Sequence, residues 1–409
     1  MKYIVVIGDG MADHPVESLG GLTPLEYANI PTMDAMAAQG IVGSAINCPK
    51  PLSAGSETAI LSIFGCDPLQ YFTGRSPMEA AAQGIAMIPG DAAFRCNLVA
   101  LDAGDMPYEE RKILSHSAGS ISGQDALDTI DALVSDPEFA EALKEADMFI
   151  HPSPSFRPLA VKHNCDPKGI TFTPPHDHLG EVCGKYLPCG KDEAKVFEHL
   201  MRLANKVLEH HPVTEKRRQS GKLGANGIWF WAEGTQVSLP SFLGQYGYDG
   251  AVISAVPLCH GIGILRGLKA ITVEGATGEL DTNFEGKLEA TWQCLQEYDF
   301  VCLHLEAPDE CTHNGDLEGK IQSIQWLDSR LIAPICQRLQ ENNMDYRMLV
   351  LSDHKTLTST RGHNGEPVPF LLYDSRENTE NGARYSEKFG DAGIFVEQGC
   401  TLLDMLFEK

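Results

Sequence analysis

The sequence predicts an α/β fold, with a mostly parallel sheet, helices on both faces and an inserted α+β domain. Short apolar runs alternate with helical stretches near both ends of the chain, a rhythm typical of parallel sheets. Between about residues 91 and 222 this texture changes, because short strands mix with helices and with loops rich in His and Pro. The chain of 409 residues is also too long for one ordinary core.

The expected core elements follow in chain order. The first strand covers residues 3–7 and runs into a turn at 8–10. The small-residue stretch 53–55 leads into a helix with Ser56 at or near its N-terminus. The alternation of strands and helices returns near residue 226. The further strands predicted for the same sheet are residues 227–231, 250–254, 270–273, 299–305 and 348–351.

The change of texture predicts the domain boundaries. We expect a discontinuous core of residues 1–78 and 223–409, with residues 79–222 as the insertion. Inside the insertion, the pattern favours a strand at 94–101 and a helix at 194–210.

Composition excludes several classes of function. A net charge of -24 argues against a nucleic-acid surface and disfavours docking on anionic lipid. No apolar run approaches the ~20 residues that span a bilayer, and the N-terminus lacks the features of a signal peptide. The 12 cysteines are scattered without a CxxC motif, which predicts reduced thiols and a cytoplasmic protein. The oligomeric state stays open.

Carboxylates and histidines follow three of the predicted strands. In open α/β sheets, ligands bind outside the carboxyl ends of strands, where loops from separate strands converge. Carboxylate oxygens with imidazole nitrogens suit Mn, Zn or Fe. Each residue taken alone also fits a turn or a helix cap, so the prediction rests on their occurring together. The candidate metal ligands are Asp9, Asp309, His313, Asp353, His354 and His363.

Ser56 is the candidate nucleophile. A serine at a helix N-terminus can be activated by a neighbouring metal, and its phosphoester would be cradled by backbone N–H groups. On spacing alone, an N-cap serine is the commoner explanation.

Several blocks of the chain together resemble a known family. They are Gly8-Asp9-Gly10-Met11, Gly55-Ser56-Glu57-Thr58-Ala59, Thr73-Gly74-Arg75, residues 275–283, residues 309–315, Ser352-Asp353-His354 and Pro367-Val368-Pro369. In this combination and order the chain resembles, over its whole length, the cofactor-independent phosphoglycerate mutases of the archaeal type, within the alkaline phosphatase superfamily. The resemblance implies an alkaline-phosphatase-like sheet and identifies the insertion as a cap that carries substrate-binding residues.

The resemblance also implies two divalent metal ions. The first would be held by Asp309, His313 and His363. The second would be held by Asp9, Asp353, His354 and the oxygen of Ser56. Mn is the expected metal, with Zn, Mg or Co as alternatives, and no 2,3-bisphosphoglycerate would be required.

Substrate-side residues follow from the same resemblance. The block containing His116 departs from it, because Ser120 stands where relatives usually place a basic residue. The matching positions are Arg75, Arg95, Arg157, His176 and Asp177.

The activity implied is the interconversion of 3-phosphoglycerate and 2-phosphoglycerate in glycolysis through a phosphoserine. The expected partner is thus a small phosphorylated carboxylate. Two alternatives share the same phosphoryl-transfer chemistry. One is a homoserine kinase-like phosphotransferase of threonine biosynthesis, an activity proposed for some bacterial members that have the block at residues 306–310. The other is a metal-dependent phosphatase. A non-catalytic metal-binding protein is a weaker alternative, because no predicted ligand position is lost. A P-loop kinase is disfavoured because the sequence has no GxxxxGK[ST] motif.

Overall fold

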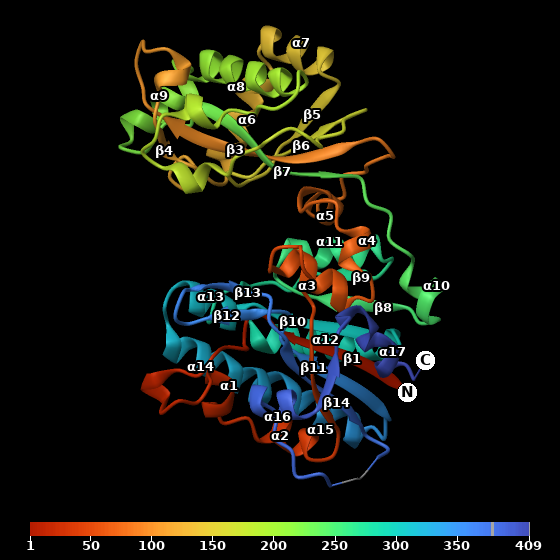
Figure 1. Ribbon diagram of the computed structural model, residues 1–409. Coiled ribbons are helices and arrows are strands. Elements are labelled where there is room, and N and C mark those ends of the chain that lie inside the picture. Colours follow the sequence, from red (N-terminus) through yellow and green to blue (C-terminus); the bar gives the residue numbers. More distant parts are fainter. Residues whose placement is uncertain (378–379, 409) are drawn as a thin grey trace. The chain divides into compact units, whose positions relative to one another are not determined.

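The computed structural model describes residues 1–377 and 380–408, and these residues form two compact units. The core unit comprises Met1–Phe72, Ala81–Gln83 and Ser238–Lys409, and the inserted unit comprises Thr73–Ala80 and Gly84–Val237. Figure 1 shows the elements of both units along the chain. Within the described residues, none of the helices combines the length and apolar character needed to cross a membrane.

The core unit is built on a mixed eight-stranded sheet, which confirms the predicted α/β fold. Strands β1, β8, β9, β10 and β11 run parallel, whereas β14 is antiparallel to both of its neighbours. The parallel strand β15 closes one edge. In spatial order the strands are β15 (Ile394–Val396), β2 (Ile41–Ala45), β14 (Val368–Asp374), β11 (Tyr346–Leu351), β1 (Lys2–Gly8), β10 (Phe300–Leu305), β8 (Gly250–Ile253) and β9 (Lys269–Ile271).

Strand β1 lies at the centre because it is almost uniformly apolar and has no exposed face. Its residues from Tyr3 onward are buried, as expected for a parallel strand covered on both sides. It pairs with β10 and β11 in a register that places Ile7 opposite both His304 and Leu351. The carboxyl ends of the three strands therefore lie side by side.

Helices and one hairpin complete the core unit (Figure 1). Helix α14 (Leu317–Trp326) continues through a π-helical turn at Leu327–Ile332 into α15 (Ala333–Glu341). The hairpin is β12 (Lys355–Leu357) with β13 (Gly362–Asn364). The helices are α1 (Pro24–Tyr27), α2 (Pro31–Ala37), α3 (Ser56–Ile63), α4 (Pro68–Tyr71), α10 (Phe242–Tyr246), α11 (Pro257–Leu265), α12 (Phe284–Glu297), α13 (Ala307–His313), α14 (Leu317–Trp326), α15 (Ala333–Glu341), α16 (Glu387–Ala392) and α17 (Leu402–Leu406).

The inserted unit is built on an antiparallel sheet. Its strands are β3 (Ala92–Leu101), β4 (Ile113–Ser115), β5 (Met148–His151), β6 (Leu159–Lys162) and β7 (Gly227–Thr235). The helices α6 (Gln124–Val134), α7 (Pro137–Glu145), α8 (Ala194–Leu208) and α9 (Pro212–Gln219) belong to it, and α5 (Ser76–Ala82) starts in it.

One strand prediction was wrong. Residues 227–231 were expected in the core sheet, but β7 pairs antiparallel with β3 along most of its length. The apolar run Ile228–Phe230 is buried in either case, because a central strand has the same pattern in any sheet. The inserted unit accordingly includes β7 and extends to Val237.

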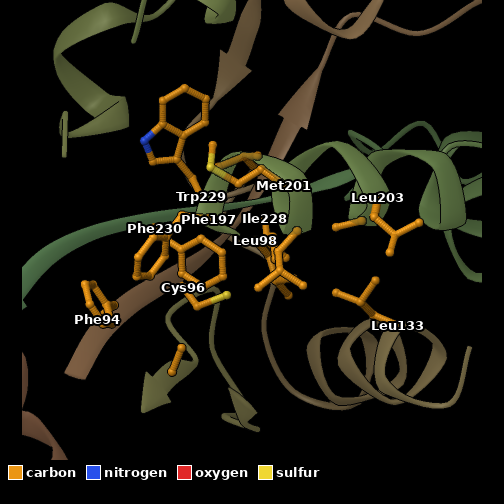
Figure 2. Close-up of a cluster of buried hydrophobic side chains, with 14 of the residues drawn as sticks. Phe94, Cys96, Leu98, Leu133, Phe197, Met201, Leu203, Ile228, Trp229 and Phe230 are labelled. Atoms are coloured by element: carbon orange, nitrogen blue, oxygen red, sulfur yellow. The ribbon is translucent and has the colours of Figure 1, made fainter. Parts of the chain in front are cut away.

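Aromatic side chains dominate the core of the inserted unit. Figure 2 shows Phe94 of β3, Phe197 of α8 and Trp229 and Phe230 of β7 in one buried cluster. The Phe94 and Phe197 rings are 4.7 Å apart between centroids. This cluster joins α8 to the central strands, so the inserted unit has a hydrophobic core of its own.

Candidate metal centre

The predicted metal ligands gather at the carboxyl ends of β1, β10 and β11. Asp9 directly follows β1, and Asp353 and His354 follow β11 after one intervening residue. Helix α13 starts just after β10, and its one-turn spacing puts Asp309 and His313 on one face. His363 comes from the β12–β13 hairpin.

Three of these side chains form a first cluster. His313 Nε2 lies 3.0 Å from Asp309 Oδ2 and 2.9 Å from His363 Nε2. His363 Nε2 lies 3.4 Å from Asp309 Oδ1. All three can direct one ligand atom to a common point, since these atoms lie within 4.8 Å of one another.

A second cluster lies around the buried side chains of Asp9, Asp353 and His354. His354 Nε2 lies 3.2 Å from Asp353 Oδ2 and 3.6 Å from Asp9 Oδ1. Asp9, Asp309 and His354 also bring ligand atoms within 4.8 Å, so Asp309 adjoins both clusters. Ser56 Oγ lies 3.3 Å from His354 Nε2 and 3.5 Å from Asp9 Oδ2.

The carboxylates of Asp353 and Asp9 each have a buried oxygen that a positive charge would stabilise. Asp353 Oδ1 accepts hydrogen bonds from the backbone N–H groups of Gly10 and His354, whereas its Oδ2 is buried with no hydrogen-bond partner among the described residues. The same holds for Asp9 Oδ1. Unsatisfied buried oxygens of this kind are costly unless a cation or a proton meets them.

Electrostatics supports the same conclusion. Burial, followed by the nearby charges of Asp353 and Asp309, raises the pKa of Asp9 well above its usual value. Burial also opposes ionisation of Asp309, but hydrogen bonds from His313 and His363 outweigh it and lower the pKa of that carboxyl. The hydrogen bond to Asp309 raises the pKa of His313 to about 9. This donor set of oxygen and imidazole nitrogen fits divalent metal ions.

Ser56 is the first residue of α3. The preceding Gly55 makes no side-chain cap, and the backbone N–H groups of Thr58 and Ala59 donate to the Gly55 carbonyl. The Ser56 hydroxyl does not cap the helix and faces Asp9 and His354 instead. The N-cap explanation therefore does not account for this serine.

Sequence reasoning missed the residues that hold the ligands. His304 is fully buried, with Nε2 3.0 Å from Asp9 Oδ2 and Nδ1 3.0 Å from Ser254 Oγ. Burial, with a contribution from Lys287, lowers the pKa of His304 to about 3, so the ring is neutral. A carboxylate only accepts, so the ring donates its Nε2 hydrogen to Asp9. A histidine inside an otherwise apolar strand was the available signal.

Asn47 and Thr356 were missed in the same way. The Asn47 amide donates to the Ser352 and Asp353 carbonyls at 3.2 and 2.9 Å. Thr356 bonds two of the ligand side chains, Asp309 and His354. Neither residue carries a sequence signal, because each acts through a partner far away in the chain.

The predicted substrate residues all lie in the inserted unit. Arg75 and Arg95 both bond the carboxylate of Glu79, and Arg95 is buried. Burial opposes ionisation of Glu79, but the two arginines outweigh it and lower its pKa. Glu79 thus neutralises part of the positive charge, a role that sequence reasoning did not assign.

The other substrate candidates belong to a chain of ring contacts. The Arg95 guanidinium lies 4.9 Å from the Trp231 ring, which in turn contacts His176 at 5.0 Å. His176 is 5.8 Å from the His116 ring. His116 contacts Phe156, over which Arg157 stacks, and Asp177 forms an ion pair with His176. Arg95, His176 and Arg157 are thus linked by one continuous chain of contacts between aromatic and cationic groups.

Comparisons with known proteins agree with this geometry. Residues 1–406 match the model of the metalloenzyme superfamily. The chain is 43% identical over 398 residues to the 2,3-bisphosphoglycerate-independent phosphoglycerate mutase of Methanosarcina acetivorans, covering 96% of this chain and 97% of the relative. It is 41% identical over 418 residues to a probable enzyme of the same name from Geobacter sulfurreducens, covering 100% of both chains.

A solved structure from Pyrococcus horikoshii has the same fold. It superposes with a TM-score of 0.80 at 29% identity, covering 100% of this chain and 96% of that one. The chain therefore belongs to the metalloenzyme superfamily and, within it, to the archaeal-type 2,3-bisphosphoglycerate-independent phosphoglycerate mutases.

Proposed function

We propose that this enzyme interconverts 3-phosphoglycerate and 2-phosphoglycerate through a phosphoserine at Ser56, with two divalent cations and without 2,3-bisphosphoglycerate. The observation that carries the proposal is the position of Ser56 Oγ, 3.3 Å from His354 Nε2 and 3.5 Å from Asp9 Oδ2. The names of the full-length relatives supply the substrate.

The ligand sets follow the two clusters. Asp309, His313 and His363 would hold the first cation. The second would be held by Asp9, Asp353, His354 and Ser56 Oγ. Mn is the proposed metal. Bound there, divalent cations would activate the serine hydroxyl and stabilise charge on the attacking and leaving oxygens.

Ser56 attacks the phosphorus in line and carries the phosphoryl group between the two hydroxyls of glycerate. The start of α3 favours this intermediate, because the first backbone N–H groups of a helix and its dipole attract a phosphate. The Ser56 hydroxyl has one hydrogen, which it can donate to Asp9 or to His354, and these two groups orient it.

We propose that the inserted unit is the cap, with the sequence-derived insertion 79–222 as its main part. Arg75, Arg95 and Arg157 would bind the carboxylate and phosphate, since guanidinium groups suit both anions. His176 and Asp177 would contact the hydroxyls of glycerate. A cap that excludes water protects the phosphoserine from hydrolysis while glycerate turns.

A side-by-side assay tests the proposal. Pure enzyme with Mn is given 3-phosphoglycerate, and in parallel homoserine with ATP. We expect formation of 2-phosphoglycerate without added 2,3-bisphosphoglycerate. Phosphorylation of homoserine alone would support the homoserine kinase-like alternative, and release of inorganic phosphate alone would support the phosphatase.

The cysteines are consistent with the proposed cytoplasmic location. All 12 lie in the described residues, and none forms a disulfide. Such free thiols persist in reducing compartments.

A further inference from the structure

Thr356 is the one residue of the β12 strand whose side chain bonds ligands of both clusters. Its Oγ1 donates to Asp309 Oδ1 of the first cluster. The same oxygen lies 3.2 Å from Nδ1 of His354 in the second cluster. The Thr356 side chain is fully buried, so no solvent competes for these bonds.

Counting hydrogens settles the direction of both bonds. A threonine hydroxyl has one hydrogen, and a carboxylate can only accept. The hydroxyl hydrogen therefore goes to Asp309, and the Thr356 oxygen must accept from His354. It follows that the ring of His354 carries a hydrogen on Nδ1, which in the neutral ring leaves a lone pair on Nε2.

The position of this hydrogen matters because of what surrounds Nε2. Asp353 Oδ2 lies 3.2 Å away and Asp9 Oδ1 lies 3.6 Å away, and neither oxygen has a hydrogen-bond partner among the described residues. With its hydrogen on Nε2, His354 would donate to Asp353 and occupy the place of a cation. With its hydrogen on Nδ1, the same ring offers a lone pair where a metal would bind.

The surrounding backbone holds Thr356 in this position. Its N–H donates to the Ala12 carbonyl at 3.1 Å, and its carbonyl accepts from Lys320 Nζ at 2.7 Å. Gly10 makes room for the hydroxyl, because a Cβ at that position would stand 2.4 Å from Thr356 Oγ1 and 2.6 Å from Asp309 Oδ1. Gly10 has a φ of 59°, which also favours glycine.

We propose that Thr356 is a positioning residue shared by the two metal sites, whose hydroxyl orients Asp309 and selects the metal-binding tautomer of His354. The inference rests on the two-metal site of the proposed function. Outer groups that orient metal ligands typically contribute 10–100-fold to metal affinity.

The tautomer is measured in metal-free protein labelled with ¹⁵N-histidine. Long-range ¹⁵N–¹H spectra report which ring nitrogen carries the hydrogen, and the His354 signals are assigned by their loss in His354→Gln. We expect the hydrogen on Nδ1 in the wild type and in Thr356→Ser. In Thr356→Val, which has nearly the same shape without the hydroxyl, we expect it on Nε2.

Metal binding is measured on the same proteins by titration with Mn and by its electron paramagnetic resonance. Thr356→Val should lose about 10–100-fold in affinity at the second site, and Thr356→Ser should stay within a few-fold of the wild type. Thr358→Val is the matched control, because its hydroxyl bonds Asp13 and touches no ligand. It should keep both the tautomer and the affinity.

The outcomes separate the inference from the proposed function. A wild-type His354 with its hydrogen on Nε2 overturns the inference without any variant, as does a Thr356→Val protein with unchanged tautomer and Mn affinity. Wild-type protein that binds no pair of Mn ions would instead refute the two-metal site. The tautomer spectra need no metal and still decide the role of Thr356 in that case.

Discussion

His313 and His363 present their Nε2 atoms to each other at a distance of 2.9 Å. His313 donates its Nδ1 hydrogen to the Arg361 carbonyl at 2.8 Å, so Nε2 is the ring nitrogen that remains to face Asp309 and His363. Both rings also contact the Asp309 carboxylate. Three ligand atoms this close together would be stabilised by a shared cation, either a proton or a metal.

Removal of metal should therefore destabilise the core unit. Dialysis against a chelator is expected to lower the thermal unfolding midpoint, and Mn should restore it, because a ligand at 100 times its Kd adds about 2.7 kcal/mol. Differential scanning calorimetry measures the shift. Asp309→Asn should abolish the response to Mn, whereas Glu285→Gln, which loses an exposed ion pair with Arg330, should keep it. An Mn response that survives in Asp309→Asn would contradict the ligand assignment.

Ser56→Ala should keep the fold and bind Mn yet lose transfer by about four to six orders of magnitude, since the nucleophile is gone. The coupled mutase assay gives the rate, and mass spectrometry of enzyme with substrate shows a phosphoserine in the wild type only. Ser241→Ala is the control, because Ser241 caps α10 through the Gly244 N–H and should affect stability by about 1 kcal/mol without affecting turnover. Near-normal turnover of Ser56→Ala would remove Ser56 from the mechanism.

Arg157→Ala should raise KM and increase hydrolysis relative to transfer. A loosely held glycerate escapes before it accepts the phosphoryl group, and water takes its place. The measurement is the ratio of inorganic phosphate to 2-phosphoglycerate formed from 3-phosphoglycerate. Arg202→Ala, which breaks ion pairs with Glu109 and Glu198 in the same unit, serves as the comparison and should leave the ratio unchanged. An unchanged KM and ratio in Arg157→Ala would count against the substrate role.

The pair of His163 and Asp91 should make stability depend on pH. A hydrogen bond of 2.6 Å to Asp91 raises the pKa of His163 above its usual value. The ring binds its proton more tightly in the folded protein, so the pair stabilises fully below about pH 6.5. This contribution is lost as the pH rises through the raised pKa. Urea unfolding of the wild type and His163→Gln should show a difference that shrinks from pH 5.5 toward about pH 8.5. A constant difference would show that the charge is unimportant.

Phe197 should be critical to the inserted unit. Its ring is fully buried against Phe94, Phe172 and Phe230, so Phe197→Ala leaves a cavity and should cost about 3–5 kcal/mol. Phe197→Leu fills most of that space and should cost less. Hydrogen exchange of β3 and β7 measures the effect locally, which matters because two units need not unfold together. Equal protection of these strands in all three proteins would contradict this account of the core.

For the inserted unit, the sequence predicted that a strand is buried but not which strand it pairs with. The apolar run at 227–231 predicted a buried strand, and β7 is one. The strand that β7 pairs with could not be predicted, because a strand buried on both faces has the same apolar pattern in the core sheet and in the sheet of the inserted unit. The antiparallel β14 and the β12–β13 hairpin were missed for a related reason, since short segments owe their conformation to distant neighbours.

The sequence by itself determined the α/β core and the gathering of acids and histidines at one sheet edge. Parallel strands all present their carboxyl ends to the same side, so residues that follow separate strands meet without further information. Only the tertiary structure decided how those side chains are held. The bonds of His304 to Asp9, of Thr356 to Asp309 and of Glu79 to Arg95 join residues whose partners no local pattern specifies. Side-chain hydrogen bonds need atoms placed within a few tenths of an ångström, and that placement comes from packing of the whole unit.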